Sequence, residues 1–140
     1  MARTNASAHL AKVPLFAACS KKELALIAKA TDVVSLPDGH ALTTQDETSR
    51  EAFVITAGKA VVRRNKRKVA ELGAGAVIGE LGLLDRGPRT ATVVADGPIE
   101  VLVIGPREFS ALLDEVPTIN HKLLKSLAGK VRELDKAAFG

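Results

Sequence analysis

Between residues 32 and 104 the chain alternates short runs of β-branched and apolar residues with turn residues, at a spacing of about ten. Each run is long enough for one strand and too short for an ordinary helix. Glycine or proline separates most of the runs, which cover residues 33–36, 41–44, 52–56, 59–62, 68–72, 76–78, 90–94 and 99–104. This pattern predicts an all-β barrel or sandwich over residues 32–104.

The hydrophobic period becomes helical on both sides of this β-rich segment. Residues 7–31 are predicted to be helical, and Ser20 and Glu23 have the spacing of a capping box, in which each side chain bonds the other's main-chain amide. Pro106 suits the first turn of one further helix, and Pro117 suits that of a longer last helix. The last helix has an apolar stripe formed by Ile119, Leu123, Leu127, Val131, Leu134 and Ala138.

The composition narrows the class of protein. The 140 residues are 46% hydrophobic and 26% charged, which is typical of one globular domain over residues 1–140. No apolar run reaches the roughly 18 residues of a membrane helix, and the first residues lack a secretion signal, so we expect a cytoplasmic protein without a membrane segment. The single cysteine, Cys19, rules out an internal disulfide. A net charge of +4 favours an anionic partner, whereas the absence of Trp and Tyr disfavours base stacking on nucleic acid.

The segment 79–93 carries the residues best suited to chemistry. Gly79 and Gly82 allow the main chain to approach a ligand closely, and residues 82–84 suit one helical turn whose first amides form an anion site. Arg89 follows a Gly-Pro turn and opens an apolar strand, so its guanidinium is held against a sheet and can offer two parallel donors to a phosphate. The Glu80 carboxylate can accept from a sugar hydroxyl or pair with Arg89. Together these groups predict a site for a phosphorylated sugar with one negative charge.

The same residues resemble the phosphate-binding cassette of cyclic nucleotide-binding domains. The matching residues are Gly79, Glu80, Leu81, Leu83, Leu84, Pro88, Arg89 and Ala91. The resemblance extends over about residues 10–135 and is closest to the domains of bacterial channels and gene regulators. It implies a mainly β fold with flanking helices, in which an eight-stranded β-roll (a double-stranded β-helix, jelly-roll-like) follows N-terminal helices and precedes two C-terminal helices at 106–138.

The resemblance also implies a role for each site residue. Arg89 would pair with the cyclic phosphate, Glu80 would accept from the ribose 2′-hydroxyl, and the Thr90 hydroxyl would reach the purine or the phosphate. The implied ligand is cyclic AMP or cyclic GMP, with no cofactor, metal or catalytic residue. The remaining ligand-binding candidates are Gly79, Leu81 and Ala91 in the cassette, the amides of Gly82 and Leu83, Ile78 and Val69 near the purine, and Lys130, Val131 and Leu134 as its cap.

The chain departs from the family pattern at three places. Ile78 replaces an aromatic residue, Gly82 replaces an alanine, and the loop 46–50 lacks two glycines. Arg89 and Glu80 could instead form a structural ion pair, or the domain could keep the fold without binding a ligand.

Other polar residues have plainer interpretations. The basic run 63–68 is predicted to be a solvated hairpin tip around Asn65, with a surface for acidic protein, lipid headgroups or nucleic acid as the alternative. The three histidines lack metal-ligand spacing. Cys19 is expected to be a buried or neutral thiol rather than a nucleophile.

We therefore expect a cyclic nucleotide sensor module that binds and does not catalyse. Ligand would draw the cassette inward, and a hinge at Gly105 and Pro106 would let the last helix close as a lid. The same helix could pair with a twin in a homodimer, and the effector protein is unknown. One alternative is a cyclic AMP-responsive transcription regulator without its DNA-binding part, since no recognition helix follows the last helix and direct DNA binding is not expected. The other alternative is a β-roll that binds no ligand, or a cupin-like enzyme. The cupin-like enzyme would need clustered metal ligands.

Overall fold

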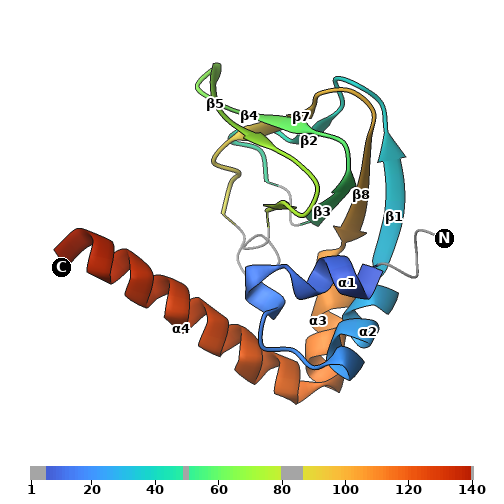
Figure 1. The fold of residues 1–140 in the computed structure, drawn as a ribbon, viewed down its shortest axis with the longest axis vertical. Helices are drawn as coiled ribbons and strands as arrows, with labels where there is room; N and C mark the ends of the chain where they lie inside the picture. The colour runs from blue at the N-terminus through green and yellow to red at the C-terminus, as the bar shows by residue number, and fades with distance from the viewer. Residues whose placement is uncertain (1–5, 49–50, 80–86, 140) are drawn as a thin grey trace.

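The computed structural model describes residues 6–48, 51–79 and 87–139, and every structural statement below refers to these residues. Three short N-terminal helices precede eight strands, and two helices follow them (Figure 1). This order confirms the predicted mainly β class with flanking helices. The elements are α1 (Ala6–Ala11), η2 (Pro14–Phe16), α2 (Lys21–Lys29), β1 (Thr31–Leu36), β2 (Ala41–Thr43), β3 (Ala52–Ala57), β4 (Ala60–Arg64), β5 (Arg67–Leu72), β6 (Val77–Ile78), β7 (Thr92–Ala95), β8 (Ile99–Ile104), α3 (Pro106–Glu115) and α4 (Pro117–Phe139).

Two antiparallel four-stranded sheets form the β-roll (Figure 1). The strand order is β1-β8-β3-β6 in one sheet and β2-β7-β4-β5 in the other. Because successive residues of a strand point to opposite faces, β8 contributes to two separate cores. Val101 faces the interior of the roll, whereas Leu102 packs against the helices. The helical core includes the rings of Phe16 and Phe109, whose centroids lie 6.1 Å apart. The sheet thereby fixes the roll to the helical layer.

The element boundaries differ from the sequence prediction at three places. The N-terminal helices predicted over residues 7–31 are three short ones, but Thr31 already belongs to β1. The expected strand 59–62 extends to Arg64, so most of the basic run lies in β4 and β5. β7 begins at Thr92, two residues later than predicted, because the main chain of Arg89 pairs with the β2–β3 segment outside the sheet.

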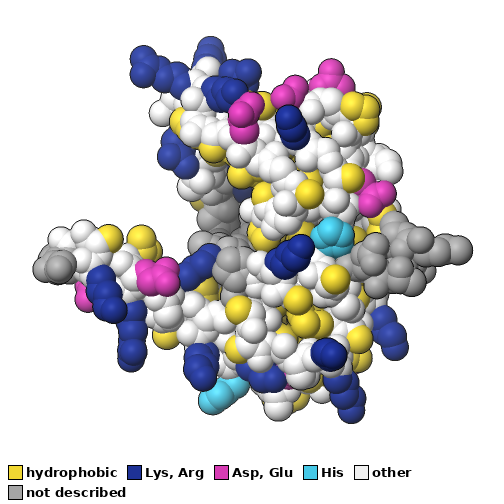
Figure 2. Space-filling view, viewed as in Figure 1, with side chains coloured by type: hydrophobic (Ala, Val, Ile, Leu, Met, Phe, Trp, Pro, Cys, Tyr) yellow, Lys and Arg dark blue, Asp and Glu magenta, His cyan; other side chains and the backbone are white. Residues whose placement is uncertain are grey.

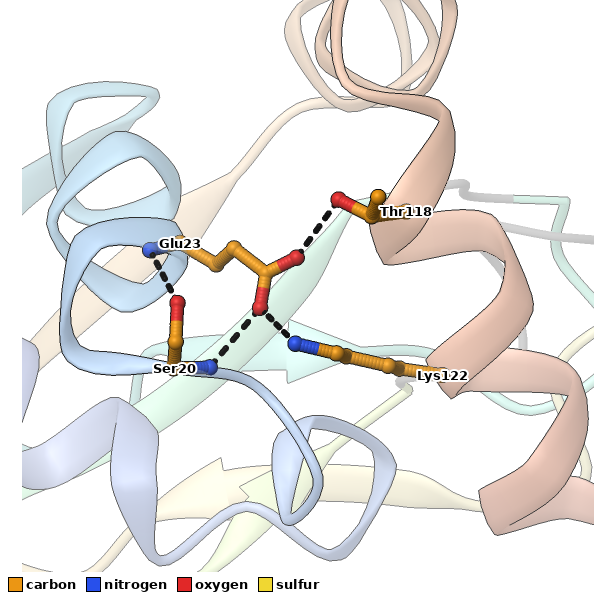
Figure 3. A network of polar contacts seen from close by, with 4 residues as sticks. All are labelled: Ser20, Glu23, Thr118 and Lys122. Carbon is orange, nitrogen blue, oxygen red and sulfur yellow. Dashed lines mark hydrogen bonds and ion pairs between the residues drawn. The ribbon is translucent and has the colours of Figure 1, made fainter.

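The carboxylate of Glu23 joins α2 to α4 (Figure 3). Its Oε1 accepts from the Ser20 amide at 2.8 Å and from the Lys122 ammonium, and its Oε2 accepts from the Thr118 hydroxyl at 2.7 Å. The Ser20 hydroxyl accepts from the Glu23 amide at 3.2 Å, which confirms the predicted capping box. The Lys122 bond is the first cause that lowers the pKa of Glu23 from 4.5 to about 2, followed by the Ser20 amide. We call these four residues the Glu23 anchor.

The last helix leaves the molecular body after its first turns. Ile119 and Leu123 are buried in the helical core, and α4 contacts η2 and α3. Beyond these contacts, α4 projects from the rest of the molecule (Figure 1), and residues 131–138 are all exposed. Within the described ranges, no helix combines the length and the apolarity that crossing a bilayer requires.

Candidate functional site

Arg89 lies where the segment after β2 runs beside the segment before β7. Its main-chain amide donates to the Glu47 carbonyl at 2.9 Å, and its own carbonyl accepts from the Asp46 amide at 2.9 Å. These two bonds hold the Arg89 backbone, and the residue is only 8% exposed. Its position is therefore set by main-chain pairing between segments that are more than forty residues apart in the sequence.

The guanidinium of Arg89 is oriented by two main-chain carbonyls. Nη1 donates to the Gly79 carbonyl at 3.3 Å, and Nη2 donates to the Glu51 carbonyl. Gly79 has a positive φ of 71°, and a Cβ built there would lie 1.9 Å from Nη1. Only glycine fits at this position, because any side chain would occupy the volume of the guanidinium. The structure thus brings together Gly79 and Arg89, two of the residues that the sequence predicted at one site.

The oriented guanidinium of Arg89 is suited to bind a phosphodiester. An arginine remains charged at any physiological pH, and its planar fork matches the two exocyclic oxygens of a phosphodiester. Because the carbonyls of Gly79 and Glu51 fix the plane of the Arg89 guanidinium, less rotational freedom is lost when an anion binds.

Part of the predicted cassette lies outside the described residues. This applies to Glu80, Leu81, Gly82 and Leu83, which were expected to supply the carboxylate and the amides of the site. The convergence of Glu80 with Arg89 therefore stays a prediction.

The residues after Arg89 are tied to neighbouring strands. Thr90 is exposed, and its carbonyl accepts from Nε of Arg64 at 3.2 Å. Ala91 is 9% exposed, and its carbonyl accepts from the Thr43 hydroxyl at 3.0 Å. Thr90 is thus at the surface, whereas the side chain of Ala91 belongs to the packed interior.

The two residues expected near the purine lie in different environments. Ile78 is 5% exposed and pairs in register with Phe53, so it forms part of the core of the roll. Val69 is 52% exposed on β5. Because β4 lies between β5 and β7, Val69 is two strands away from the strand that follows Arg89.

The predicted capping residues lie on the projecting part of α4. Val131 and Leu134 are 63% and 70% exposed, and Lys130 is half-buried. Val131 and Leu134 are therefore exposed to solvent in this arrangement.

The main-chain groups that hold Arg89 could not be predicted from the sequence. The carbonyls of Glu47 and Glu51 and the amide of Asp46 have no sequence signal, because every residue carries such groups.

Glu51 also lines a pocket of about 370 Å³ between β1, β2 and β3, and Phe53 and Leu42 contribute to it. Arg89 is not among its lining residues, so this pocket differs from the Arg89 site.

Other chemically competent groups lie elsewhere. Burial, followed by the negative charge of Glu23, raises the pKa of the half-buried Cys19 thiol, which keeps it protonated. In the part of the chain that the structure describes, no three His, Cys, Asp or Glu side chains gather as metal ligands would.

Comparisons with known proteins point to one family. The family model described as cyclic nucleotide-binding domain matches residues 33–116. The chain is 30% identical over 127 residues to the cyclic AMP receptor protein of Thermus thermophilus and 34% identical over 129 residues to a cAMP-dependent protein kinase regulatory subunit of Mycosarcoma maydis. These alignments cover 87% and 86% of this chain but only 59% and 25% of those proteins, so the chain spans at most about three-fifths of these curated relatives.

A solved structure with a similar fold comes from Streptomyces coelicolor. It is the N-terminal domain of a transcriptional regulator, 30% identical in sequence, with a TM-score of 0.85. The superposition covers 92% of this chain and 93% of that one. Such coverage includes the helices as well as the roll and confirms the β-roll fold.

Proposed function

The chain belongs to the cyclic nucleotide-binding domain family, and from this premise we propose that it is a sensor module whose Arg89 binds the phosphate of a cyclic nucleotide. The family is regulatory rather than catalytic, so the proposed activity is binding. The observation that carries the proposal is the buried guanidinium of Arg89, oriented by the carbonyls of Gly79 and Glu51. A charged group held in this way is prepared for an anion before the anion arrives.

Cyclic AMP is the first ligand that we propose. Two of the relatives are named for cyclic AMP. Thr90, the exposed residue that follows Arg89, is compatible with either cyclic AMP or cyclic GMP, so both nucleotides belong in the test. We keep a cytoplasmic location as part of the proposal, since the one cysteine of the chain needs no oxidising compartment.

Calorimetric titration of wild type and Arg89→Ala with both nucleotides tests the site. The variant loses charge-assisted hydrogen bonds of about 1.5–3 kcal/mol each, so affinity should fall about tenfold to a few hundredfold. Arg107→Ala is the matched control, because Arg107 is exposed on α3. Arg89→Lys keeps the charge but not the fork, and circular dichroism reports whether each variant is folded. Unchanged affinity in folded Arg89→Ala would overturn the assignment.

The output of the sensor is proposed to be the projecting part of α4. The exposed side chains of Val131 and Leu134 have no core to hold them in place, so this part of the helix can change its position at low cost. A ligand can shift that position only by the difference between its affinities for the two arrangements. We propose that nucleotide at Arg89 favours an arrangement in which these residues approach the purine.

The apolar face of α4 as a whole also suits a homodimer. Leu124, Leu127, Val131, Leu134 and Ala138 recur at the a and d spacing of a coiled coil. In a parallel pair, Lys130 would face Asp135 of the second copy, which places opposite charges across the seam. We propose that the apolar face of α4 is covered by a second copy when it does not cover ligand.

A second candidate function is the sensor part of a transcription regulator. The similarity to the N-terminal domain of a transcriptional regulator, with a TM-score of 0.85, favours it. A mobility-shift assay with the full gene product and genomic promoter fragments, with and without cyclic AMP, decides this point. Absence of any nucleotide-dependent shift would remove this candidate and leave the binding module intact.

A further inference from the structure

The positive charge of the chain is concentrated in one hairpin. Residues 63–68 contain five of the 20 Lys and Arg residues, whereas the remaining sequence holds 15 cations and 16 anions. The net charge of +4 is therefore due entirely to this segment. We call it the basic hairpin; its cations are Arg63, Arg64, Lys66, Arg67 and Lys68.

The basic hairpin projects from the roll, and its residues are exposed. All five cations are exposed, and the β4–β5 connection stands out from the sheet (Figure 1). Dark blue side chains gather over this part of the molecule, with acidic side chains beside them (Figure 2).

The basic hairpin is also held in a defined shape. Asn65 and Lys66 have φ values of 53° and 68°, as a tight two-residue turn requires. The Asn65 amide and carboxamide oxygen both bond to the Gln45 side chain at 2.8 Å. Arg64 Nε donates to the Thr90 carbonyl at 3.2 Å. The cations are therefore presented on a fixed support rather than on a mobile loop.

The pairing of the two strands places like charges opposite each other. Arg63 lies across from Lys68, and Arg64 lies across from Arg67. Like charges at directly opposed positions destabilise a sheet. Cationic side chains on an edge strand protect a sheet from aggregation, and β5 is the edge strand of its sheet. This reason does not apply to β4, because β4 is paired on both sides. A merely solvated tip does not need this repulsion.

We propose that the basic hairpin docks an acidic segment of a partner protein. The patch is small, and it is bordered by acids: Asp46 and Glu47 follow Gln45, and Glu71 lies on β5. A lipid surface or a nucleic-acid duplex carries continuous negative charge and would meet these acids as well. Successive strand residues point to opposite faces, so the cations lie on both faces of the ribbon, where a flat membrane would contact only one. A short acidic segment can wrap around the tip.

The test measures binding of a fluorescein-labelled oligoglutamate peptide by fluorescence anisotropy at low salt. The variant Arg63→Gln/Lys66→Gln/Arg67→Gln leaves the bonds of Arg64 and Lys68 in place. The control Lys12→Gln/Lys29→Gln/Arg107→Gln removes the same charge from exposed positions elsewhere. The hairpin variant should bind at least about tenfold more weakly than wild type, since each lost surface pair contributes a fraction of a kcal/mol, and the control should bind as wild type does.

Three results would overturn the proposal. They are equal loss of oligoglutamate binding in both triple variants, no loss in the hairpin variant, and tighter binding of wild type to a DNA duplex or to phosphatidylserine vesicles than to oligoglutamate. The melting temperature of the hairpin variant should equal or exceed that of wild type, because opposed like charges are removed. Arg67→Gln alone, which relieves one opposed pair, provides the same comparison if the triple variant does not fold. None of these measurements involves a cyclic nucleotide, so their outcome is independent of the proposed sensor function.

Discussion

The two parts of α4 have the same apolar period and opposite surroundings. In the inner part, residues 117–127, Ile119 and Leu123 are 0% and 3% exposed, and the Glu23 anchor holds the helix to α2. In the outer part, residues 128–139, Val131 and Leu134 are 63% and 70% exposed. An apolar stripe thus specifies a helix face but not what covers it. We interpret the inner part as a fixed base and the outer part as the segment that is free to respond to a ligand.

Shortening one apolar side chain of α4 should give the largest difference in stability between the inner part and the outer part. Ile119→Ala removes buried methyl groups and leaves a cavity, so the free energy of unfolding should fall by about 2–5 kcal/mol. Leu134→Ala, the matched control in the outer part, should change it by less than about 0.5 kcal/mol. Urea denaturation followed by circular dichroism measures both values. Similar losses in the two variants would contradict the difference between the inner and outer parts.

Removal of the charge on Glu23 should have the next largest effect. Glu23→Gln weakens the bonds to Lys122 and Thr118, and a hydrogen bond to a charged group contributes about 1.5–3 kcal/mol. The lower part of this range is expected, because the Lys122 side chain is 32% exposed and water screens the pair. Glu133→Gln, on the exposed surface of the outer part, is the control. A Glu23→Gln protein as stable as this control would show that the Glu23 anchor does not hold α4.

The same anchor predicts a pH dependence with a definite sign. The folded-state pKa of Glu23 is lowered from 4.5 to about 2, so between these values the unfolded chain binds more protons at this site. The contribution of Glu23 is therefore present above pH 4.5 and is lost as the pH falls toward 2. The difference in unfolding free energy between wild type and Glu23→Gln should narrow as the pH is lowered from 6 to 3. A difference that stays constant would contradict this account of Glu23.

The smallest effect on folding, and a clear one on assembly, is expected for Leu134→Lys. A lysine at this exposed position costs the monomer little, but it places like charges in the seam of a two-stranded coiled coil. Sedimentation equilibrium should show a weaker dimer than in wild type. Glu133→Lys, one residue away and off the apolar face, should leave the dimer unchanged. Dimers of equal affinity in wild type and Leu134→Lys would show that α4 does not form the interface.

The features with local determinants could be predicted from the sequence. The capping box of Ser20 and Glu23 needs only residues three apart, and both of its bonds form as predicted. The alternation of short apolar runs predicted the strands of the roll, because one strand needs only its own residues to show its two faces.

The long-range partners had no such signal. Lys122 reaches Glu23 from a position 99 residues further along the chain. The carbonyl of Glu51 that holds Arg89 belongs to the backbone, so no residue type reveals it. The period of the apolar residues in α4 predicted a helix with one apolar face. Because this period is the same in the buried and the exposed part, it does not distinguish them. How deeply each part of α4 is buried depends on where the neighbouring elements end. The periodic pattern of apolar residues carries no information on this.

We propose that a nucleotide bound at Arg89 moves the outer part of α4 relative to the roll while the inner part stays fixed. Spin labels in a Cys19→Ala background, on Ser35→Cys in β1 together with Val131→Cys, report this movement by double electron–electron resonance. The pair Ser35→Cys and His121→Cys is the matched control for the inner part, and all three labelled side chains are exposed.

Saturating cyclic AMP should shift the distance between the labels at 35 and 131 and leave the distance between those at 35 and 121 unchanged, and Arg89→Ala should abolish the shift. An identical 35–131 distance distribution with and without bound nucleotide would contradict the account.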